Sequence, residues 1–499
     1  MKQYIFGTVL LVFVTSIVFN LSCNKKELDL LPHGPTEANY FTQESDFQKA
    51  VYGVYSKLSD VYWYNAGSSL APMNFAEGDD ITTNDANQAF ETFGQLQPSN
   101  GSVSYMYGIW YQMIARANVV IEKVAGVKDG VYTTANLKNY NKGEALFLRG
   151  LAYYYLWNYY GTSPLRNDRV TDASQFTPPN TTGTQLLEQA IKDFGDAAGL
   201  LPASWDATNR GRATANAANG MLGKSLVFKA AATKTTADYT AALAAFNKIA
   251  GANLLANFAD NFAFDTENNA ESLFEFQATQ PFGLDNVWLS NDFDNAIGSM
   301  SVFWGYYNNV SLNGQSRFYA TTKLLAAFDA GDPRLDSTVK VADKTIKKYI
   351  TRDKFTQTNV ASANNPRILR YADVLLLKAE ATLQSGGSTT DAITLINQVR
   401  TRARSMAVAG IVPANYPTTE TDKTKIMGWI MNERFIELAG EGQRWFDLRR
   451  WQMQGLITLN NAFFSSNVAM AFDVTKHIYM PIPNSELDVN PNMKQNPGY

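Results

Sequence analysis

The sequence predicts a mainly α-helical fold: a right-handed scaffold of tetratricopeptide-like helix pairs that carries a loop-rich insertion with short strands. Apolar residues recur at three- and four-residue spacing over long stretches, as in amphipathic helices. The helices come in consecutive pairs, and pairs that cannot cover their own apolar faces must stack on their neighbours. The expected helices of these stretches cover residues 103–124, 139–160, 184–201, 214–232, 239–250, 370–385 and 389–404.

The N-terminal residues have the pattern of a secretory signal that ends at a cysteine. Lys2 is followed by an uncharged apolar run over residues 4–19, shorter than the ~20 residues that span a bilayer. Cys23 is the single cysteine and has no disulfide partner, so we expect a lipoprotein signal with acylation of Cys23. A strong lipoprotein cleavage box has Leu three residues before the cysteine, and this sequence has Asn20 there instead. An ordinary secretory signal or a short transmembrane anchor is the alternative.

Changes of composition divide the rest of the chain. The polar residues after Cys23 lead to Pro32, which resists helix formation, and a helix of roughly six turns follows Thr36. Within the insertion, alternation over residues 272–277 predicts a strand. The expected parts are a signal peptide (1–22), a lipid-anchored tether (23–35), an N-terminal helical region (36–254), a loop-rich variable insertion (255–365) and a C-terminal region with the last helix pair, an Arg/Glu-rich helix and a Pro-rich strap (366–499).

Small residues lie at positions that suit close contact between paired helices. Gly223 and Ala241 are 18 residues apart, and Ala379 and Ala392 are 13 apart. In tetratricopeptide units of about 34 residues, small residues recur at the eighth and twentieth positions. The spacing matches this pattern loosely.

Composition excludes several functions. A net charge of −3 gives no electrostatic reason to bind nucleic acid. His33 and His477 are far apart and Cys23 is the single thiol, so a His/Cys metal site is not expected, nor is a cofactor. Aromatic residues make up 13% of the chain, more than a helical core needs, and some rings are therefore expected at the surface.

Four segments carry a resemblance to a known family. Residues 429–451 read WIMNERFIELAGEGQRWFDLRRW and residues 478–499 read IYMPIPNSELDVNPNMKQNPGY. With GEALFLRGLAYYYLWNYYGTSPL (143–165) and RYADVLLLKAEA (370–381), the chain resembles the SusD/RagB family of outer-membrane nutrient-binding lipoproteins. The resemblance implies a surface-exposed lipoprotein, held in the outer membrane by acylated Cys23, that binds oligosaccharide and caps a SusC-like TonB-dependent transporter without catalysis. A peptide- or protein-binding member of the family is the alternative.

Two glutamates in the first of these segments need a physical interpretation. Glu433 and Glu437 lie one helical turn apart, a spacing that also suits the carboxylate pair of a glycoside hydrolase. The nearby Arg434, Arg444, Arg449 and Arg450 favour ion pairing instead, and paired carboxylates lose the raised pKa that a general acid needs. We therefore predict no enzyme activity and a structural ion-pair network of Glu433, Arg434, Glu437, Arg444 and Asp447.

Two clusters of rings and polar groups are candidates for ligand binding. The first follows the opening helix; the resemblance implies that it reaches the binding face, with Asp79 and Asp80 on or beside that face. The second lies in the insertion, outside helical spacing, where rings that stack on sugars are flanked by Gly and Asn. Trp205 is a third candidate, and the near-neutral charge suits an uncharged oligosaccharide. Alternatively the rings are core residues or contact the transporter. The candidates are Trp63, Asp79, Asp80, Phe93, Trp288, Trp304, Tyr306, Tyr307 and Arg317.

Overall fold

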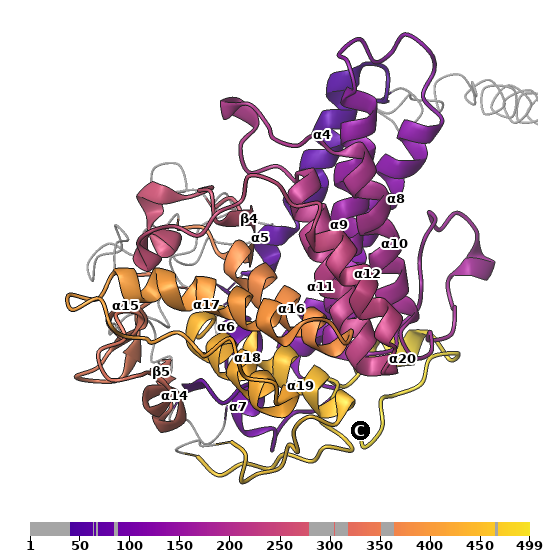
Figure 1. The fold of residues 1–499 in the computed structure, drawn as a ribbon. Helices are drawn as coiled ribbons and strands as arrows, with labels where there is room; N and C mark the ends of the chain where they lie inside the picture. Colours follow the sequence, from indigo (N-terminus) through magenta and orange to yellow (C-terminus); the bar gives the residue numbers. More distant parts are fainter. Residues whose placement is uncertain are drawn as a thin grey trace, which may run out of the picture.

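Long helices packed side by side in chain order form the N-terminal half in the computed structural model (Figure 1). The structure describes residues 40–62, 64–65, 68–83, 88–278, 304, 318–350, 364–464 and 468–499. The helices of this half are α4 (Glu44–Tyr55), α5 (Leu58–Val61), α6 (Ala71–Phe75), α7 (Ala89–Thr92), α8 (Gly101–Ala125), α9 (Leu137–Tyr160), α10 (Gln185–Leu200), α11 (Ala215–Thr233) and α12 (Thr236–Phe246).

Helices α8 and α9 pack antiparallel. Tyr107 near the start of α8 contacts Tyr160 at the end of α9, with ring centroids 4.9 Å apart. Further along α8, Asn118 accepts a hydrogen bond of 2.8 Å from Arg149 in the middle of α9. The N-terminus of α8 is fixed by Asn100, whose side chain accepts hydrogen bonds from the first turn. The apolar periodicity therefore locates both long helices to within about two residues.

The opening helix is shorter than predicted. Helix α4 has 12 residues, about three turns, and α5 follows after a break at Ser56 and Lys57. The Ser56 hydroxyl donates to the backbone carbonyl of Gly53 at 3.0 Å, and such local bonding competes with helix continuation. Lys57 turns inward and pairs with buried Asp60. Polar side chains at the end of the apolar pattern thus end the helix earlier than periodicity indicates.

A small residue allows close contact between α11 and α12. A Cβ atom on Gly223 would lie 2.4 Å from a ring carbon of Phe246, closer than real side chains approach. In the C-terminal pair, Ala379 and Ala392 are both fully buried. The predicted role is confirmed for Gly223, Ala379 and Ala392, but Ala241 is exposed and its neighbour Ala242 is buried instead. The described fold is mainly helical and tetratricopeptide-like.

The C-terminal half continues the stack, because α16 packs on α12 and joins the two halves. Between the later helices, Gly440 and Gly442 adopt φ values of 71° and 73°. A Cβ on Gly442 would lie 2.9 Å from the carbonyl oxygen of Asn74, so this turn requires glycine. The helices of this half are α16 (Tyr371–Gln384), α17 (Thr389–Ser405), α18 (Lys423–Glu437), α19 (Arg444–Gln454) and α20 (Asn484–Val489).

The described part of the insertion contains short helices and strands as well as loops. The predicted strand is confirmed as β4 (Ser272–Glu275), which pairs antiparallel with β8 (Arg367–Arg370). A second sheet has the order β3 (Ile81–Thr82), β5 (Tyr319–Ala320), β7 (Thr345–Ile346) and β6 (Val339–Lys340). Strands of the insertion therefore pair with segments outside it. The remaining elements here are α14 (Thr322–Ala327), α15 (Arg334–Thr338) and the short pair β1 (Tyr64–Asn65) and β2 (Ser68–Ser69).

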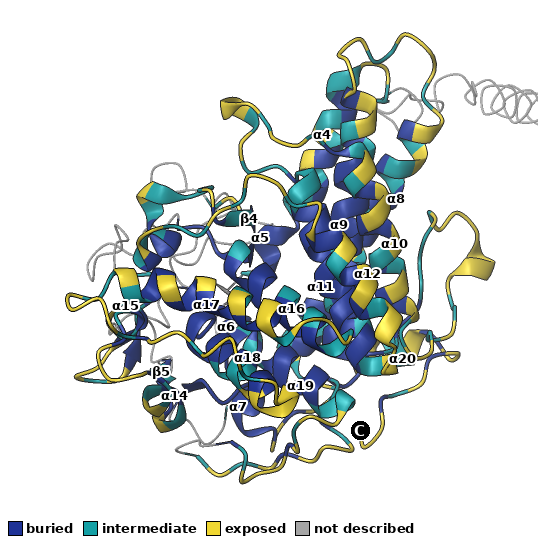
Figure 2. Cartoon of the chain, in the orientation of Figure 1, coloured by how far each residue is buried: buried dark blue, intermediate teal, exposed yellow. Residues whose placement is uncertain are grey.

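Buried residues line the inner faces of the helices, while exposed residues concentrate on loops and outer faces (Figure 2). Trp110 of α8 stacks on Tyr155 of α9 with centroids 4.7 Å apart and an interplanar angle of 8°. The C-terminal strap crosses the end of α9, where the Met480 amide donates to the Tyr159 carbonyl at 2.7 Å. In the part of the chain that the structure describes, no helix has the length and apolar character needed to span a membrane.

Candidate functional site

The sequence-predicted ligand residues fall into two groups in the structure. The first group, Asp79, Asp80, Phe93 and Trp304, lies among the described residues. The other lies outside the described residues and comprises Trp63, Trp288, Tyr306, Tyr307 and Arg317.

Trp304 is a core residue, contrary to the prediction that it faces a ligand. Its side chain is 0% exposed. The indole nitrogen donates to the Asn364 carbonyl at 2.9 Å, and the ring stacks on Tyr349 at 4.2 Å with an interplanar angle of 9°. A ring enclosed in this way presents no face to a sugar at the surface.

Phe93 and the two aspartates of the first cluster are also buried. Phe93 contacts Phe472 and Trp445, with centroids at 5.1 and 5.4 Å. Asp79 pairs with Arg444, whose Nη2 lies 3.1 Å away, and with Lys323. These contacts fit a packing role rather than contact with a surface ligand.

The ionisation of the two aspartates differs because their partners differ. Burial alone would raise the pKa of Asp79, but Arg444 and Lys323 lower it below the ordinary value. Asp80 accepts one hydrogen bond, of 3.1 Å, from the Gly440 amide. Burial therefore raises the pKa of Asp80 to about 6, and the charge on Asp79 adds to the rise. Both carboxylates attach residues 79–80 to the turn between α18 and α19.

Glu433 and Glu437 are fully buried and paired with arginines. Arg334 donates to both, at 2.6 Å to Glu433 and 2.9 Å to Glu437. Arg370 donates to Glu437 at 2.7 Å. Burial opposes ionisation, yet Arg402, Arg370 and Arg334 hold the pKa of Glu437 far below its usual range. An ionised carboxylate of this kind cannot supply the proton that a glycosidase acid must donate.

The arginines that pair with these glutamates are not the ones that the sequence indicated. Glu433 is also bound by Arg400 at 2.9 Å. Of the predicted network, Arg434 binds Asp447 at 2.8 Å. The other nearby arginines have different partners: Arg444 binds Asp79, Arg449 binds Asn158, and Arg450 binds Glu380 and Asp447.

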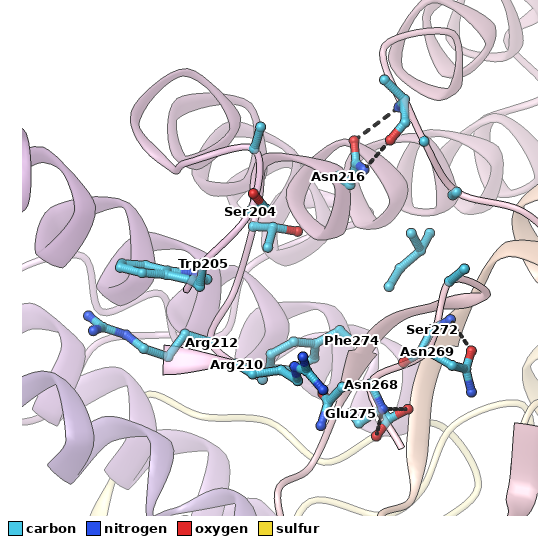
Figure 3. A pocket seen from close by; sticks show the side chains of 18 residues that line it. Ser204, Trp205, Arg210, Arg212, Asn216, Asn268, Asn269, Ser272, Phe274 and Glu275 are labelled. Carbon is cyan, nitrogen blue, oxygen red and sulfur yellow. Dashed lines mark hydrogen bonds between the residues drawn. The ribbon is translucent and has the colours of Figure 1, made fainter. Parts of the chain in front are cut away.

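A solvent-accessible groove lies where the loop between α10 and α11 faces the β4 segment of the insertion (Figure 3). It consists of two hollows with volumes of about 410 and 250 Å³. Both hollows share Arg210, Gly211, Arg212 and Glu275 as lining residues. Gln277, which lines the smaller hollow, belongs to the insertion. We call these two hollows the groove.

The loop that forms one wall is fixed by short-range hydrogen bonds. Asp206 caps a 3-10 turn by accepting from the amides of Thr208 and Asn209, at 2.9 and 3.0 Å. The indole nitrogen of Trp205 donates to the Ala213 carbonyl at 2.8 Å. At the far end of the groove, Asn216 pairs with the backbone of Ala250 through hydrogen bonds of 2.7 and 3.1 Å.

Arg212 organises the aromatic side of the groove. Its guanidinium makes a bidentate ion pair with Glu144, at 2.7 and 2.6 Å. Burial disfavours its charge, but Glu144 raises the pKa of Arg212 above the ordinary value. The same guanidinium lies 4.0 Å from the ring centre of Trp205 and 5.4 Å from that of Tyr52. The ion pair therefore fixes a cation close to two rings, and Tyr52 remains 46% exposed.

The opposite wall presents amides. Asn268 and Gln277 form a reciprocal pair, with hydrogen bonds of 2.8 and 3.0 Å between their side chains. Glu275 accepts from the Asn268 amide at 3.1 Å and from Asn365 at 2.9 Å. Gly211 has a φ of 93°, and a Cβ there would lie 2.2 Å from the side chain of Gln277. Only glycine lets the two walls approach this closely.

One exposed ring, one half-buried ring, amides and a guanidinium suit noncovalent binding of a polar ligand with flat apolar faces. Sequence reasoning singled out Trp205 alone in this groove. Tyr52, Arg210, Arg212, Asn268 and Gln277 were missed, because their segments are far apart in the sequence and no short motif joins them. The run Arg210-Gly211-Arg212 beside Trp205 was the available signal.

Comparison with solved structures places the fold in one superfamily. A SusD superfamily protein from Bacteroides vulgatus is 25% identical, with a TM-score of 0.69 over 92% of this chain and 100% of that chain. A laminarin-binding SusD-like protein is 21% identical, with a TM-score of 0.71 and the same coverage. Among curated proteins, SusD-like protein P2 of Formosa agariphila is 26% identical over 92% of this chain and 94% of that protein.

Family models match both halves of the chain. Residues 293–499 match the SusD family, and residues 29–226 match a family described as starch-binding and associating with the outer membrane. The chain belongs to the SusD/RagB family.

Proposed function

We propose that this protein is a non-catalytic cell-surface lipoprotein that binds oligosaccharide and delivers it to a SusC-like TonB-dependent transporter. The groove is the observation that carries the proposal. It holds an exposed ring in Tyr52, a half-buried ring in Trp205 and amide side chains in Asn268 and Gln277. Family membership and the laminarin-binding relative favour a glycan over a peptide.

The groove and the insertion together form the proposed ligand face. Gln277 lines the groove and is itself part of the insertion. Ligand contact by Trp63, Trp288, Tyr306, Tyr307 and Arg317 is therefore proposed alongside the groove residues.

The proposal is tested by a glycan array on the protein lacking residues 1–23, followed by titration calorimetry with the best-bound glycan. Tyr52→Ala should weaken binding about tenfold or more, because truncation of a central ring costs more than ~1–2 kcal/mol. Phe176→Ala is the matched control, since Phe176 is 60% exposed and lines neither hollow. If the Tyr52 variant binds as tightly as the wild type, the groove is not the site; binding to no glycan would refute glycan capture itself.

Membrane attachment is proposed to depend on acylation of Cys23. Replacing this residue by Ser removes the thiol that carries the lipid, so the variant should appear in the soluble fraction after fractionation of the cells. Retention of the Cys23→Ser protein on membranes after a carbonate wash would contradict the lipid anchor. Copurification of the wild-type protein with a TonB-dependent transporter tests the partner.

A further inference from the structure

The charges that line the groove do not cancel. Three charged side chains line the two hollows: Arg210, Arg212 and Glu275. Arg212 is neutralised by its bidentate pair with Glu144. Glu275 is neutralised by Arg367, whose Nε lies 3.4 Å away. Arg210 is exposed and makes no hydrogen bond or ion pair with any residue that the structure describes. The groove therefore keeps one unpaired positive charge.

Arg210 is positioned centrally rather than at the rim. It lines both hollows, and Figure 3 shows its side chain between Arg212 on one side and Asn268 with Glu275 on the other. Its backbone is held on both sides, because the Asn209 and Arg212 side chains bond to each other at 2.7 Å. The guanidinium is thus a free cation on a fixed stretch of backbone.

The groove contains the three kinds of group that bind a charged sugar: an aromatic ring, amides and a guanidinium. The exposed Tyr52 ring supplies a flat face for the apolar side of a sugar ring. On the other wall, the Asn268 amide lines the larger hollow and the Gln277 amide lines the smaller one, where they are placed to meet hydroxyl groups. A guanidinium fork binds an oxyanion through two parallel hydrogen bonds, and no described carboxylate occupies that fork on Arg210.

We infer that the oligosaccharide bound in this groove is anionic, with an acid group, a uronate carboxylate or a sulfate ester, that pairs with Arg210. This inference rests on the proposed function and refines it, because overall composition alone suits an uncharged glycan. The negative charge of the whole chain does not oppose the pairing, since charges further apart than the Debye length of about 8 Å are largely screened at physiological salt.

The test compares charged oligosaccharides with their neutral parents. The probes are an oligogalacturonate, its carboxyl-reduced form, a sulfated galactan oligosaccharide and its desulfated form, each titrated into wild-type protein and Arg210→Gln. We expect at least one anionic probe to bind about tenfold more tightly than its neutral parent, and Arg210→Gln to abolish that difference. Raising the salt concentration should weaken the binding of the anionic probe and leave the binding of its neutral parent unchanged.

Two further variants isolate the role of the fork. Arg210→Lys keeps the charge but loses the planar fork, so its affinity should fall between those of wild type and Arg210→Gln. Lys128→Ala removes an exposed cation that lines neither hollow and should bind as wild type does. Arg210→Gln, Arg210→Lys and Lys128→Ala should have the melting temperature of the wild type, because neither the Arg210 nor the Lys128 side chain has a described partner.

The outcomes separate this inference from the proposed function. Equal affinity for charged and neutral forms, with Tyr52-dependent binding retained, overturns the anionic ligand and leaves glycan capture in place. A charge preference that survives Arg210→Gln also overturns the assignment, because the anion would then be bound elsewhere. Failure to bind any glycan on a broad array refutes the proposed function and the inference together.

Discussion

Replacing Glu437 by Gln is expected to destabilise the fold, because this one carboxylate holds three buried guanidinium groups. It is 0% exposed and accepts from Arg370 at 2.7 Å, from Arg334 at 2.9 Å and from Arg402. Gln has almost the same shape, so the substitution removes the charge without opening a cavity. Removing one partner of a buried ion pair costs ~3–5 kcal/mol.

The lower end of that range applies here, because each arginine keeps another acidic partner. Arg370 and Arg402 retain Glu271, at 2.7 and 3.0 Å, and Arg334 retains Asp332. For a chain of this length the entropy of unfolding is roughly 1 kcal/mol per kelvin, so a loss of about 3 kcal/mol lowers the melting temperature by about 3 °C.

Differential scanning calorimetry at pH 7 measures this shift. Asp196→Asn is the matched control, because its pair with Lys192 is largely exposed and should contribute under ~0.5 kcal/mol. If the Glu437 and Asp196 variants shift the melting temperature equally, the buried network does not stabilise the fold as argued.

The effect of Glu437 also has a defined pH dependence. Its pKa is far below the ordinary value in the folded protein, so its contribution is fully present above the unfolded pKa of about 4.3 and is lost as the pH falls towards the folded value. The difference between wild type and Glu437→Gln should therefore stay constant from about pH 8 to 5 and narrow below about pH 4. A difference that widens below pH 4 would show that the carboxylate is not stabilised by its arginines.

Two further predictions follow from buried residues of the first and second clusters. Trp304→Ala removes a fully enclosed ring stacked on Tyr349, so it should cost ~3–5 kcal/mol of stability. Thermal melts should show a lower melting temperature, and glycan titration should show that the folded fraction keeps its affinity. Weakened glycan binding at unchanged stability would instead place Trp304 on the ligand face. Burial raises the pKa of Asp80 to about 6, which penalises the fold as the pH rises from about 4 through 6. Asp80→Asn should therefore stabilise the fold by roughly 1–3 kcal/mol at pH 8, seen as a higher melting temperature, and should leave it unchanged at pH 4. An equal effect at both pH values would contradict the raised pKa of Asp80.

The helices were predictable because their signal is local. Apolar spacing over residues 103–124 and 139–160 needs no knowledge of distant partners, and α8 and α9 follow it closely. The same holds for Gly223, whose role depends on the helix pair in which it lies. The opening helix was overestimated because periodicity does not record the local bond of Ser56 that ends it.

The site was not predictable in the same way, because its contacts join distant segments. Glu433 and Glu437 were correctly read as a pair that arginines bind, but Arg334 and Arg370 lie 99 and 67 residues from the glutamates they contact. Nearby arginines in the sequence find other partners. The burial of the rings could not be predicted from sequence spacing either, since Trp304 lies outside any helical pattern and yet packs in the core.

The buried ion pairs hold one wall of the groove in place. Glu271 precedes β4 directly and is bound by Arg370 of β8 and by Arg402 of α17, both of which also bind Glu437 of α18. The strand that forms one wall of the groove is thereby anchored to the C-terminal helices. A wall fixed before the ligand arrives reduces the ordering cost of binding, so more of the contact energy remains as affinity. The charges of this network, on Glu271, Arg370, Arg402 and Glu437, are buried and line neither hollow, so they position the wall without forming part of the groove surface.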